Sequence, residues 1–227
     1  MGTMSLTLRV LARLLAYPDA ELRRHLPELR SALQDERALP PARIAELESL
    51  MDRIAWAQAL QAEASYVELF DRGRSTSLHL FEHVHGDSRE RGPAMIDLIQ
   101  TYEAAGLQFG DGELPDHLSV LLEYASTQPP AQARAFLGET SHIVNAIFAA
   151  LIKRGSAYAS VLGAVLDLAG VRAQAVRLED DPALDDSWEE PAVFGGCSTA
   201  GQAKPGTPQP VQIVRNPALR SSTGARE

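Results

Sequence analysis

The chain has 227 residues, of which 45% are hydrophobic and 22% are charged, as expected for a single soluble globular domain. Its formal net charge of −9 argues against a nucleic-acid-binding protein, because such proteins present a basic surface. Cys197 is the single cysteine, so no intramolecular disulfide bond can form.

The N-terminal segment "LTLRVLARLLAY" predicts the first helix. Leu8, Leu11 and Leu15 follow helical spacing, and Leu14 widens the same apolar face. Arginines interrupt this segment, and it is far shorter than a membrane span. We therefore expect a cytoplasmic protein that does not insert into a membrane.

Apolar spacing predicts helices through most of the chain that follows. A second segment runs from Asp19 to about Glu36, and we expect Pro27 to break it. Pro40 and Pro41 open a third helix. The run from about 58 to 70 continues helical and ends in "YVELF".

Further helices are predicted beyond a polar central stretch. One contains Met95, Leu98, Ile99 and Tyr102 and ends at Gly106. In "ELPDHLSVLLEYAS" we place Pro115 in the first helical turn and expect the Asp116 carboxylate to complement the amide dipoles there. Two more helices are predicted over about 131–153 and 156–169.

These elements predict an all-α fold, a single globular helical bundle formed by residues 1–170. Beyond Val171 the periodicity is lost. Seven carboxylates lie between Glu179 and Glu190, and the following residues are rich in proline and glycine. We interpret residues 171–227 as an acidic, then Pro/Gly-rich tail that is largely disordered.

The sequence "HLFEH" matches the zinc motif H-x-x-E-H, with His79 and His83 as ligands and Glu82 as base. A zinc-dependent hydrolase is therefore one alternative. It would need a third ligand and a substrate cleft, which the sequence does not identify. Phosphate-binding loops, dinucleotide motifs and nucleophile elbows are absent from the sequence. We expect no enzyme activity, no catalytic residue, no metal and no cofactor.

Charged and histidine side chains are dense in the connector that follows residue 70. They are Asp71, Arg72, Arg74, Glu82, His83, His85, Asp87, Arg89, Glu90 and Arg91. Two interpretations remain open. The side chains form an internal ion-pair network that fixes a long loop, or they line a groove that binds an amphipathic basic helix of a partner.

The segment "LFDRGRSTSLHLFEHVHGDSRERGPAMIDLIQTYEAAGL", residues 69–107, closely resembles the nitrate reductase delta subunit family of NarJ-type molybdenum cofactor assembly chaperones. The segment "ELPDHLSVLLEY" shares this resemblance, and "LARLLAYPDA" and "SWEEPAVFGGC" share it more loosely. The "PDH" and "Y-x-x-L-F" elements are also similar to the wider TorD and DmsD redox-enzyme chaperones.

The resemblance implies an all-helical cytoplasmic chaperone of the TorD/NarJ type. Its partner would be the apoprotein of the nitrate reductase catalytic (alpha) subunit, bound through the N-terminal peptide until the molybdenum cofactor is inserted. Proteins of molybdenum cofactor biosynthesis are a further partner class. The resemblance also implies that H-x-x-E-H is accidental, because the family commonly has an apolar residue at the position of His79.

The resemblance assigns client binding to the "Y-x-x-L-F" and "PDH" elements. We add residues of the polar connector to this predicted binding surface. The residues concerned are Tyr66, Leu69, Phe70, Asp71, Arg72, Glu82, His83, His85, Arg89, Pro115, Asp116 and His117. An alternative function keeps this surface but changes the client, as in a TorD-like chaperone for another molybdenum oxidoreductase.

Overall fold

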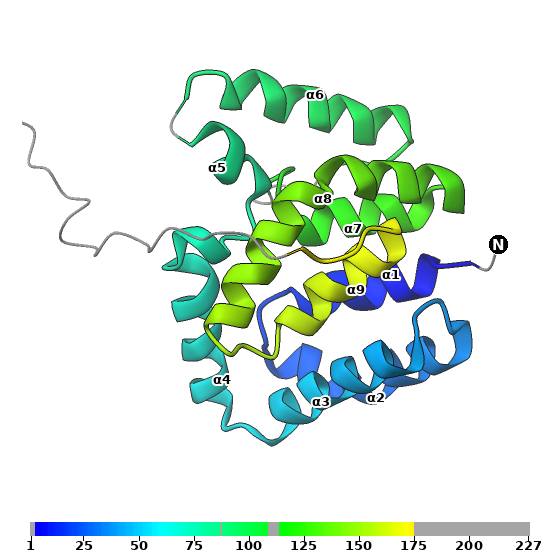
Figure 1. Cartoon of the computed structure of the whole chain (residues 1–227), viewed down its shortest axis with the longest axis vertical. Coiled ribbons are helices and arrows are strands. Elements are labelled where there is room, and N and C mark those ends of the chain that lie inside the picture. The colour runs from blue at the N-terminus through cyan, green and yellow to red at the C-terminus, as the bar shows by residue number, and fades with distance from the viewer. Residues whose placement is uncertain (1–2, 87, 109–113, 175–227) are drawn as a thin grey trace, which may run out of the picture. The chain divides into compact units, whose positions relative to one another are not determined.

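The computed structural model describes residues 3–86, 88–108 and 114–174, and every element in these ranges is a helix. In chain order the elements are α1 (Ser5–Leu14), α2 (Ala20–Glu36), α3 (Pro41–Trp56), α4 (Ala59–Tyr66), the π-helix η1 (Val67–Asp71), the 3₁₀ helix η2 (Arg74–Thr76), α5 (Leu80–His85), α6 (Arg91–Ala104), α7 (Leu118–Thr127), α8 (Pro130–Lys153) and α9 (Ala159–Ala169) (Figure 1). The predicted all-α fold is confirmed.

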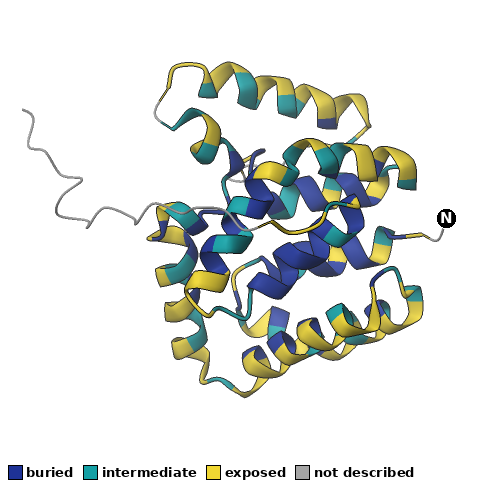
Figure 2. Cartoon of the chain, viewed as in Figure 1, coloured by how far each residue is buried: buried dark blue, intermediate teal, exposed yellow. Residues whose placement is uncertain are grey.

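Helix α9 is the centre of the hydrophobic core. Every residue of α9 except Asp167 is buried, and the helix packs against α8, α3 and α1. Figure 2 shows α9 in dark blue along most of its length. Asp167 accepts a hydrogen bond from Arg43 Nε at 2.8 Å. Gly163 makes room for this arginine, because a Cβ there would lie 2.6 Å from its guanidinium carbon.

Helix α1 forms as predicted. Leu8, Leu11, Leu14 and Leu15 are all buried, and α1 packs against α7 and α2. Asp19 begins the next helix by accepting a hydrogen bond from the Leu22 backbone N–H at 2.7 Å.

The prediction that Pro27 breaks the second helix is wrong. Helix α2 continues through Pro27, which lies on its exposed face. An internal proline costs about 3 kcal/mol through its missing N–H and its clash with the preceding turn. Buried Leu22 and Leu26 before the proline and buried Leu33 after it hold both halves against the core and offset this cost.

The predicted helix over 58–70 is present, but its last turn is wound as the π-helix η1. Tyr66 and Phe70 are buried on either side of this transition. A π-helical hydrogen bond spans five residues instead of the four of an α-helix, which changes the faces of the side chains that follow it.

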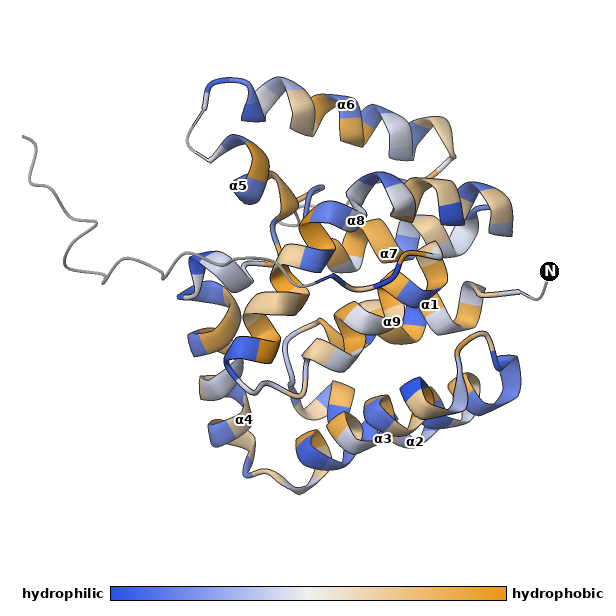
Figure 3. Ribbon diagram, viewed as in Figure 1, coloured by the Kyte–Doolittle hydropathy of each residue, from blue (hydrophilic) through white to orange (hydrophobic). Residues whose placement is uncertain are grey.

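Helix α6 is only partly a core helix. Tyr102 near its C-terminal end is buried, whereas Met95, Leu98 and Ile99 are half-buried and Ile96 is 56% exposed. Figures 1 and 3 show α6 at one edge of the bundle, next to α5 and with orange residues along it. The predicted apolar face exists, but the bundle covers it fully only at Tyr102.

Among the described helices, α8 alone has the length and hydropathy to cross a membrane. It nevertheless packs as a core helix, with Leu137, Val144, Ile147 and Leu151 fully buried, and it contacts α9 extensively. A single helix of this length and hydropathy is weak evidence for a membrane span.

The described chain ends in a segment fixed to α8. Val171 packs against the core, the Gln174 N–H donates to Asn145 Oδ1 at 2.8 Å, and Asn145 Nδ2 donates to the Gln174 carbonyl at 3.1 Å. The domain boundary at 170/171 stays a prediction. The predicted disordered tail lies outside the described residues from 175 onward.

Candidate functional site

The segment before α5 pairs with the segment before α7. His79 and His117 form an isolated antiparallel bridge. The Leu80 N–H donates to the Asp116 carbonyl at 3.0 Å, and the Leu118 N–H donates to the Leu78 carbonyl at 2.9 Å. Two motifs that are far apart in the sequence therefore share one site.

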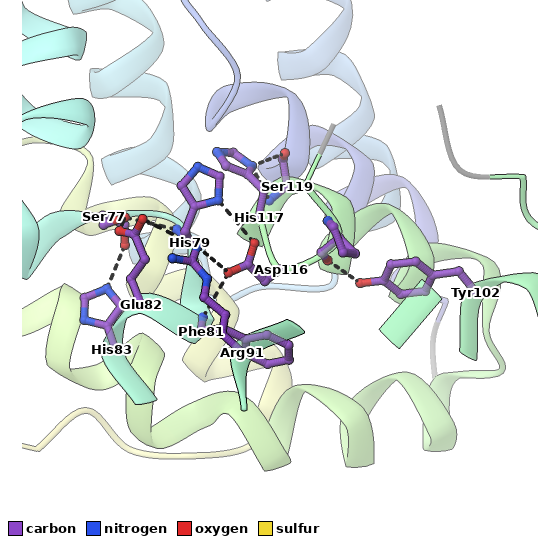
Figure 4. A network of polar contacts seen from close by, with 11 residues as sticks. Ser77, His79, Phe81, Glu82, His83, Arg91, Tyr102, Asp116, His117 and Ser119 are labelled. Carbon is purple, nitrogen blue, oxygen red and sulfur yellow. Dashed lines mark hydrogen bonds and ion pairs between the residues drawn. The ribbon is translucent and has the colours of Figure 1, made fainter. Parts of the chain in front are cut away.

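Asp116 is the centre of this site and is fully buried. Its carboxylate lies 3.3 Å from His79 Nδ1 and 3.6 Å from Arg91 Nη2, and it accepts a hydrogen bond from the Phe81 N–H at 3.2 Å (Figure 4). The carboxylate thus balances the Arg91 charge and caps the first turn of α5.

The expected position of Asp116 in a helix beginning at Pro115 is therefore corrected. Helix α7 begins at Leu118, and its cap is His117, whose Nδ1 accepts a hydrogen bond from the Ser119 N–H at 3.3 Å. Asp116 lies one residue further out, which frees its side chain to cap α5 instead.

Glu82 and His83 join the same cluster through Ser77. The Ser77 hydroxyl donates to Glu82 Oε2 at 2.6 Å, and Arg91 Nη2 lies 3.5 Å from Glu82 Oε1. His83 Nε2 lies 2.9 Å from the Ser77 carbonyl. We call Ser77, His79, Glu82, His83, Arg91, Asp116 and His117 the Asp116 network. Of the charged side chains in the polar connector, Glu82 and Arg91 form an ion pair within this network, as the first of the two interpretations expects.

The two bridging histidines have opposite pKa shifts. The hydrogen bond that His79 Nδ1 donates to the Asp116 carboxylate raises the pKa of His79 above its usual value, although burial opposes this effect. Burial is the larger cause and the nearby His79 the smaller cause that together lower the pKa of His117 to about 4. Their rings lie edge to face, with centroids 5.0 Å apart.

We predict that His117 makes the fold less stable in mild acid. Its pKa is lower in the folded than in the unfolded chain, where it is about 6.5, so the unfolded state gains the proton first as the pH falls. Stability should decrease between about pH 6.5 and pH 4 for this reason. The contribution of His79, whose pKa is raised, is instead lost as the pH rises through that pKa.

The test is His117→Asn, because asparagine is also a good helix cap and does not titrate. Urea unfolding of both proteins at several pH values should give a smaller loss of stability for the variant between pH 6.5 and pH 4. Parallel curves for the two proteins would contradict the assignment to His117.

The structure does not bring His79, Glu82 and His83 together as a zinc site. His79 precedes α5 and bonds to Asp116, whereas His83 lies within α5 and bonds to the Ser77 carbonyl. Among the described residues, no three His, Cys, Asp or Glu side chains are grouped to hold a metal ion.

Tyr66 and Phe70 belong to a separate aromatic cluster. Their ring centroids lie 4.9 Å apart, and both rings pack against Tyr158, while Tyr17 packs against Tyr66. The Tyr66 hydroxyl donates to the Leu15 carbonyl at 2.6 Å, and burial raises its pKa. These two predicted client contacts are built into the core.

The remaining predicted site residues differ in exposure. Asp71, Arg72 and Arg89 are exposed, and Leu69 is half-buried. His85 is half-buried and its ring packs edge to face on Phe81. Pro115 is buried, and its carbonyl accepts a hydrogen bond from the Tyr102 hydroxyl at 2.8 Å. The structure thus unites Glu82, His83, Asp116 and His117 in the Asp116 network, and the other predicted residues are not members of it.

A groove that the sequence did not indicate lies between α1, α2, α7 and the turn after α6. Its volume is about 620 Å³. Its surface is mostly apolar, and it is lined by Leu6, Arg9, Val10, Arg13, Glu28, Leu29, Ala32, Tyr102, Leu107, Gln108, Val120, Glu123, Tyr124, Ser126 and Thr127. We call it the α1/α7 groove. One feature of the sequence could have indicated this groove: Leu6 and Val10 are apolar but lie off the predicted apolar face of α1.

Comparison with known proteins identifies several similar sequences. The family model described as "Nitrate reductase delta subunit" matches residues 16–162. The chain is 41% identical over 194 residues to "Nitrate reductase molybdenum cofactor assembly chaperone NarJ" of Escherichia coli (strain K12), which covers 81% of this chain and 82% of that protein. It is 39% identical over 196 residues to the same strain's NarW, named as a probable chaperone of this kind, with 82% of each chain covered.

A solved structure has a similar fold. It is the crystal structure of a proposed redox enzyme maturation protein from Archaeoglobus fulgidus, with a TM-score of 0.51 and 20% sequence identity. The alignment covers 74% of this chain and 94% of that one. At this level of identity the similarity concerns the fold alone.

Proposed function

Because this chain belongs to the nitrate reductase delta subunit family, we propose that it is a chaperone for molybdenum cofactor assembly in nitrate reductase. The observation that carries the proposal is the family match over residues 16–162, which spans most of the described helices. The family acts in cofactor assembly and is not catalytic, in agreement with the prediction of no enzyme activity.

The finer proposal concerns how the client is held. The chaperone binds the apoprotein of the catalytic subunit through its N-terminal peptide, in the cytoplasm, until the cofactor has been inserted. Proteins of molybdenum cofactor biosynthesis meet the client during this time, while the chaperone still holds it. The net charge of −9 supports this proposal, since an acidic protein attracts a basic peptide.

Exposure gives two different roles to seven of the twelve predicted client-binding residues. We propose that Asp71, Arg72 and Arg89 can contact a client directly, because they are exposed. Tyr66, Phe70, Pro115 and Asp116 are buried, so their part is to fix the helices that carry the contact surface.

The test is titration of the full chain with a synthetic peptide that has the first 20 or so residues of the client, enough for several helical turns. We expect saturable binding that is at least about tenfold tighter than that of a scrambled peptide. Equal binding of both peptides would contradict N-terminal recognition.

The alternative client is tested in the same assay. A TorD-like chaperone for another molybdenum oxidoreductase would bind the N-terminal peptide of that enzyme more tightly than the nitrate reductase peptide. Co-purification of the chaperone with the catalytic subunit, lost when the first residues of that subunit are deleted, would support the nitrate reductase assignment.

A further inference from the structure

We propose that the exposed face of α3 is a self-complementary surface through which two copies of this chain form a dimer, with their α3 helices antiparallel. The face contains no residue of the α1/α7 groove or of the Asp116 network. The proposal goes beyond the proposed function and does not depend on it, because it uses only the charges and apolar side chains of α3 and its two ends.

The first observation is an exposed apolar corner at the turn from α3 to α4. Trp56 ends α3 and is 87% exposed, and Leu60 in the first turn of α4 is 78% exposed. These are the two largest exposed fractions among the large hydrophobic residues that the structure describes. In Figure 1 the turn between α3 and α4 lies at the lower edge of the bundle. Tryptophan is enriched among the residues that dominate binding at protein interfaces, so this corner indicates a contact surface.

The second observation is a pair of opposite charges on the same face of α3. Arg53 is exposed and has no ion-pair partner among the described residues. Glu46 is also exposed and lies seven positions earlier, which places it about two helical turns away on the same face. Glu46 pairs with Arg43 of its own helix, but a carboxylate has room to accept from a second arginine.

These charges match each other when a second α3 lies antiparallel to the first, with Ser49 on the twofold axis. Glu46 lies three positions before Ser49, and Arg53 lies four positions after it, so each arginine faces the glutamate of the second copy. A closed dimer requires such an arrangement, in which the same surface of each copy complements itself. Ser49 is small and exposed, so the two helices can approach closely at the axis.

The same register brings apolar residues together at both ends of the helix pair. Trp56 lies seven positions after Ser49, and Ala42 lies seven positions before it. Pro40 and Pro41, which precede Ala42, are exposed as well. The indole of each copy therefore meets a surface of proline and alanine on the other, where its large apolar area is removed from water.

Two further carboxylates of α3 do not oppose this pairing. Asp52 pairs with Arg30 of α2 at 2.5 Å, and Glu48 accepts a hydrogen bond from Gln34 of α2 at 2.6 Å. Both side chains therefore have partners within their own chain, on the α2 side of α3. The charge on this face that lacks a partner is the one that Glu46 of the second copy would balance.

We expect the dimer to be weak. The net charge of −9 makes two copies repel each other at long range. An interface formed by one helix from each copy belongs to the small class, below about 1,200 Å², that is typical of weak complexes. A dissociation constant of about 10 to 100 μM follows, so the monomer predominates at about 1 μM chain, where unfolding is measured.

The experiment is analytical ultracentrifugation of the full chain from about 1 to 300 μM, a range that brackets this dissociation constant. We expect the wild type to pass from monomer to dimer. Arg53→Glu and Glu46→Arg each place like charges opposite one another and should weaken the dimer about tenfold or more. The double variant Glu46→Arg/Arg53→Glu restores opposite charges and should return to within about fivefold of the wild type. Trp56→Ala should weaken the dimer about tenfold.

Arg89→Glu is the matched control, because it makes the same change in net charge as Arg53→Glu at an exposed residue outside α3. Its dissociation constant should stay within about threefold of the wild type. The substituted side chains are all exposed, so the variants should fold, which circular dichroism checks before ultracentrifugation.

Three results would overturn the proposal. The first is a wild type that stays monomeric up to about 300 μM. The second is a dimer that Arg53→Glu and Trp56→Ala leave intact, because another surface would then form it. The third is a dimer that both single charge variants abolish and the double variant does not restore, which would exclude the antiparallel register around Ser49.

Discussion

Replacement of Asp116 with alanine is expected to lower the free energy of unfolding by about 3 kcal/mol, because removing one partner of a buried charge pair leaves the other uncompensated. Asp116 is fully buried, while the side chains of His79 and Arg91 remain 31% and 25% exposed. Partial hydration of those partners places the effect at the lower end of the range for buried pairs.

The measurement is urea unfolding followed by circular dichroism near neutral pH. The matched control is Asp97→Ala, which removes an exposed carboxylate from α6 and should change stability by no more than about 0.5 kcal/mol. An Asp116→Ala protein as stable as the control would contradict the central role of Asp116.

A second signal separates loss of the network from general loss of stability. The hydrogen bond that His79 donates to the Asp116 carboxylate is the main cause of the raised pKa of His79. NMR titration of the folded variant should therefore give a lower pKa for His79 than in the wild type. An unchanged value would mean that other groups set this pKa.

The helices that could be predicted from sequence are those with strong local signals. The apolar face of α1, with Leu8 and Leu11, and the opening of α3 at Pro41 both depend on residues within a few positions of one another. Local spacing is sufficient there, since the pattern and the fold favour the same structure.

The errors in the fold occurred where tertiary contacts override local preference. Pro27 is a helix breaker by itself, yet the buried leucines on both sides keep α2 continuous. The start of α7 was placed too early, because the backbone of Asp116 pairs with Leu80, 36 positions earlier in the chain. Nothing in the local sequence indicates such a pair.

The sequence predicted candidate residues for a site but not their arrangement in space. The family resemblance pointed to Asp116, His117, Tyr66 and Phe70, yet it could not place the last two in a separate cluster. Residue type alone does not distinguish a buried aromatic ring from an exposed anchor, since both are common at interfaces and in cores. The α1/α7 groove is lined by residues of α1, α2, α6 and α7, so no single segment indicates it.

Replacement of Phe70 with alanine should lower the free energy of unfolding by about 3 to 5 kcal/mol, the usual range for a buried phenylalanine. Phe70 is 4% exposed, and its ring centroid lies 4.9 Å from that of Tyr66 and 5.1 Å from that of Tyr158. Its removal leaves a cavity between two rings that cannot close fully. Trp56→Ala is the control, because this ring is 87% exposed and should contribute less than about 0.5 kcal/mol.

The same residue distinguishes a core role from a direct client contact. Phe70→Leu keeps most of the apolar volume and should cost less than about 1.5 kcal/mol, so the variant remains folded for a binding assay. With the ring buried behind Tyr66 and Tyr158, we expect its affinity for the client peptide to stay within about twofold of the wild type. A stable Phe70→Leu protein that binds the peptide about tenfold more weakly would instead make Phe70 a client anchor, and the aromatic cluster would then have to open when the client binds.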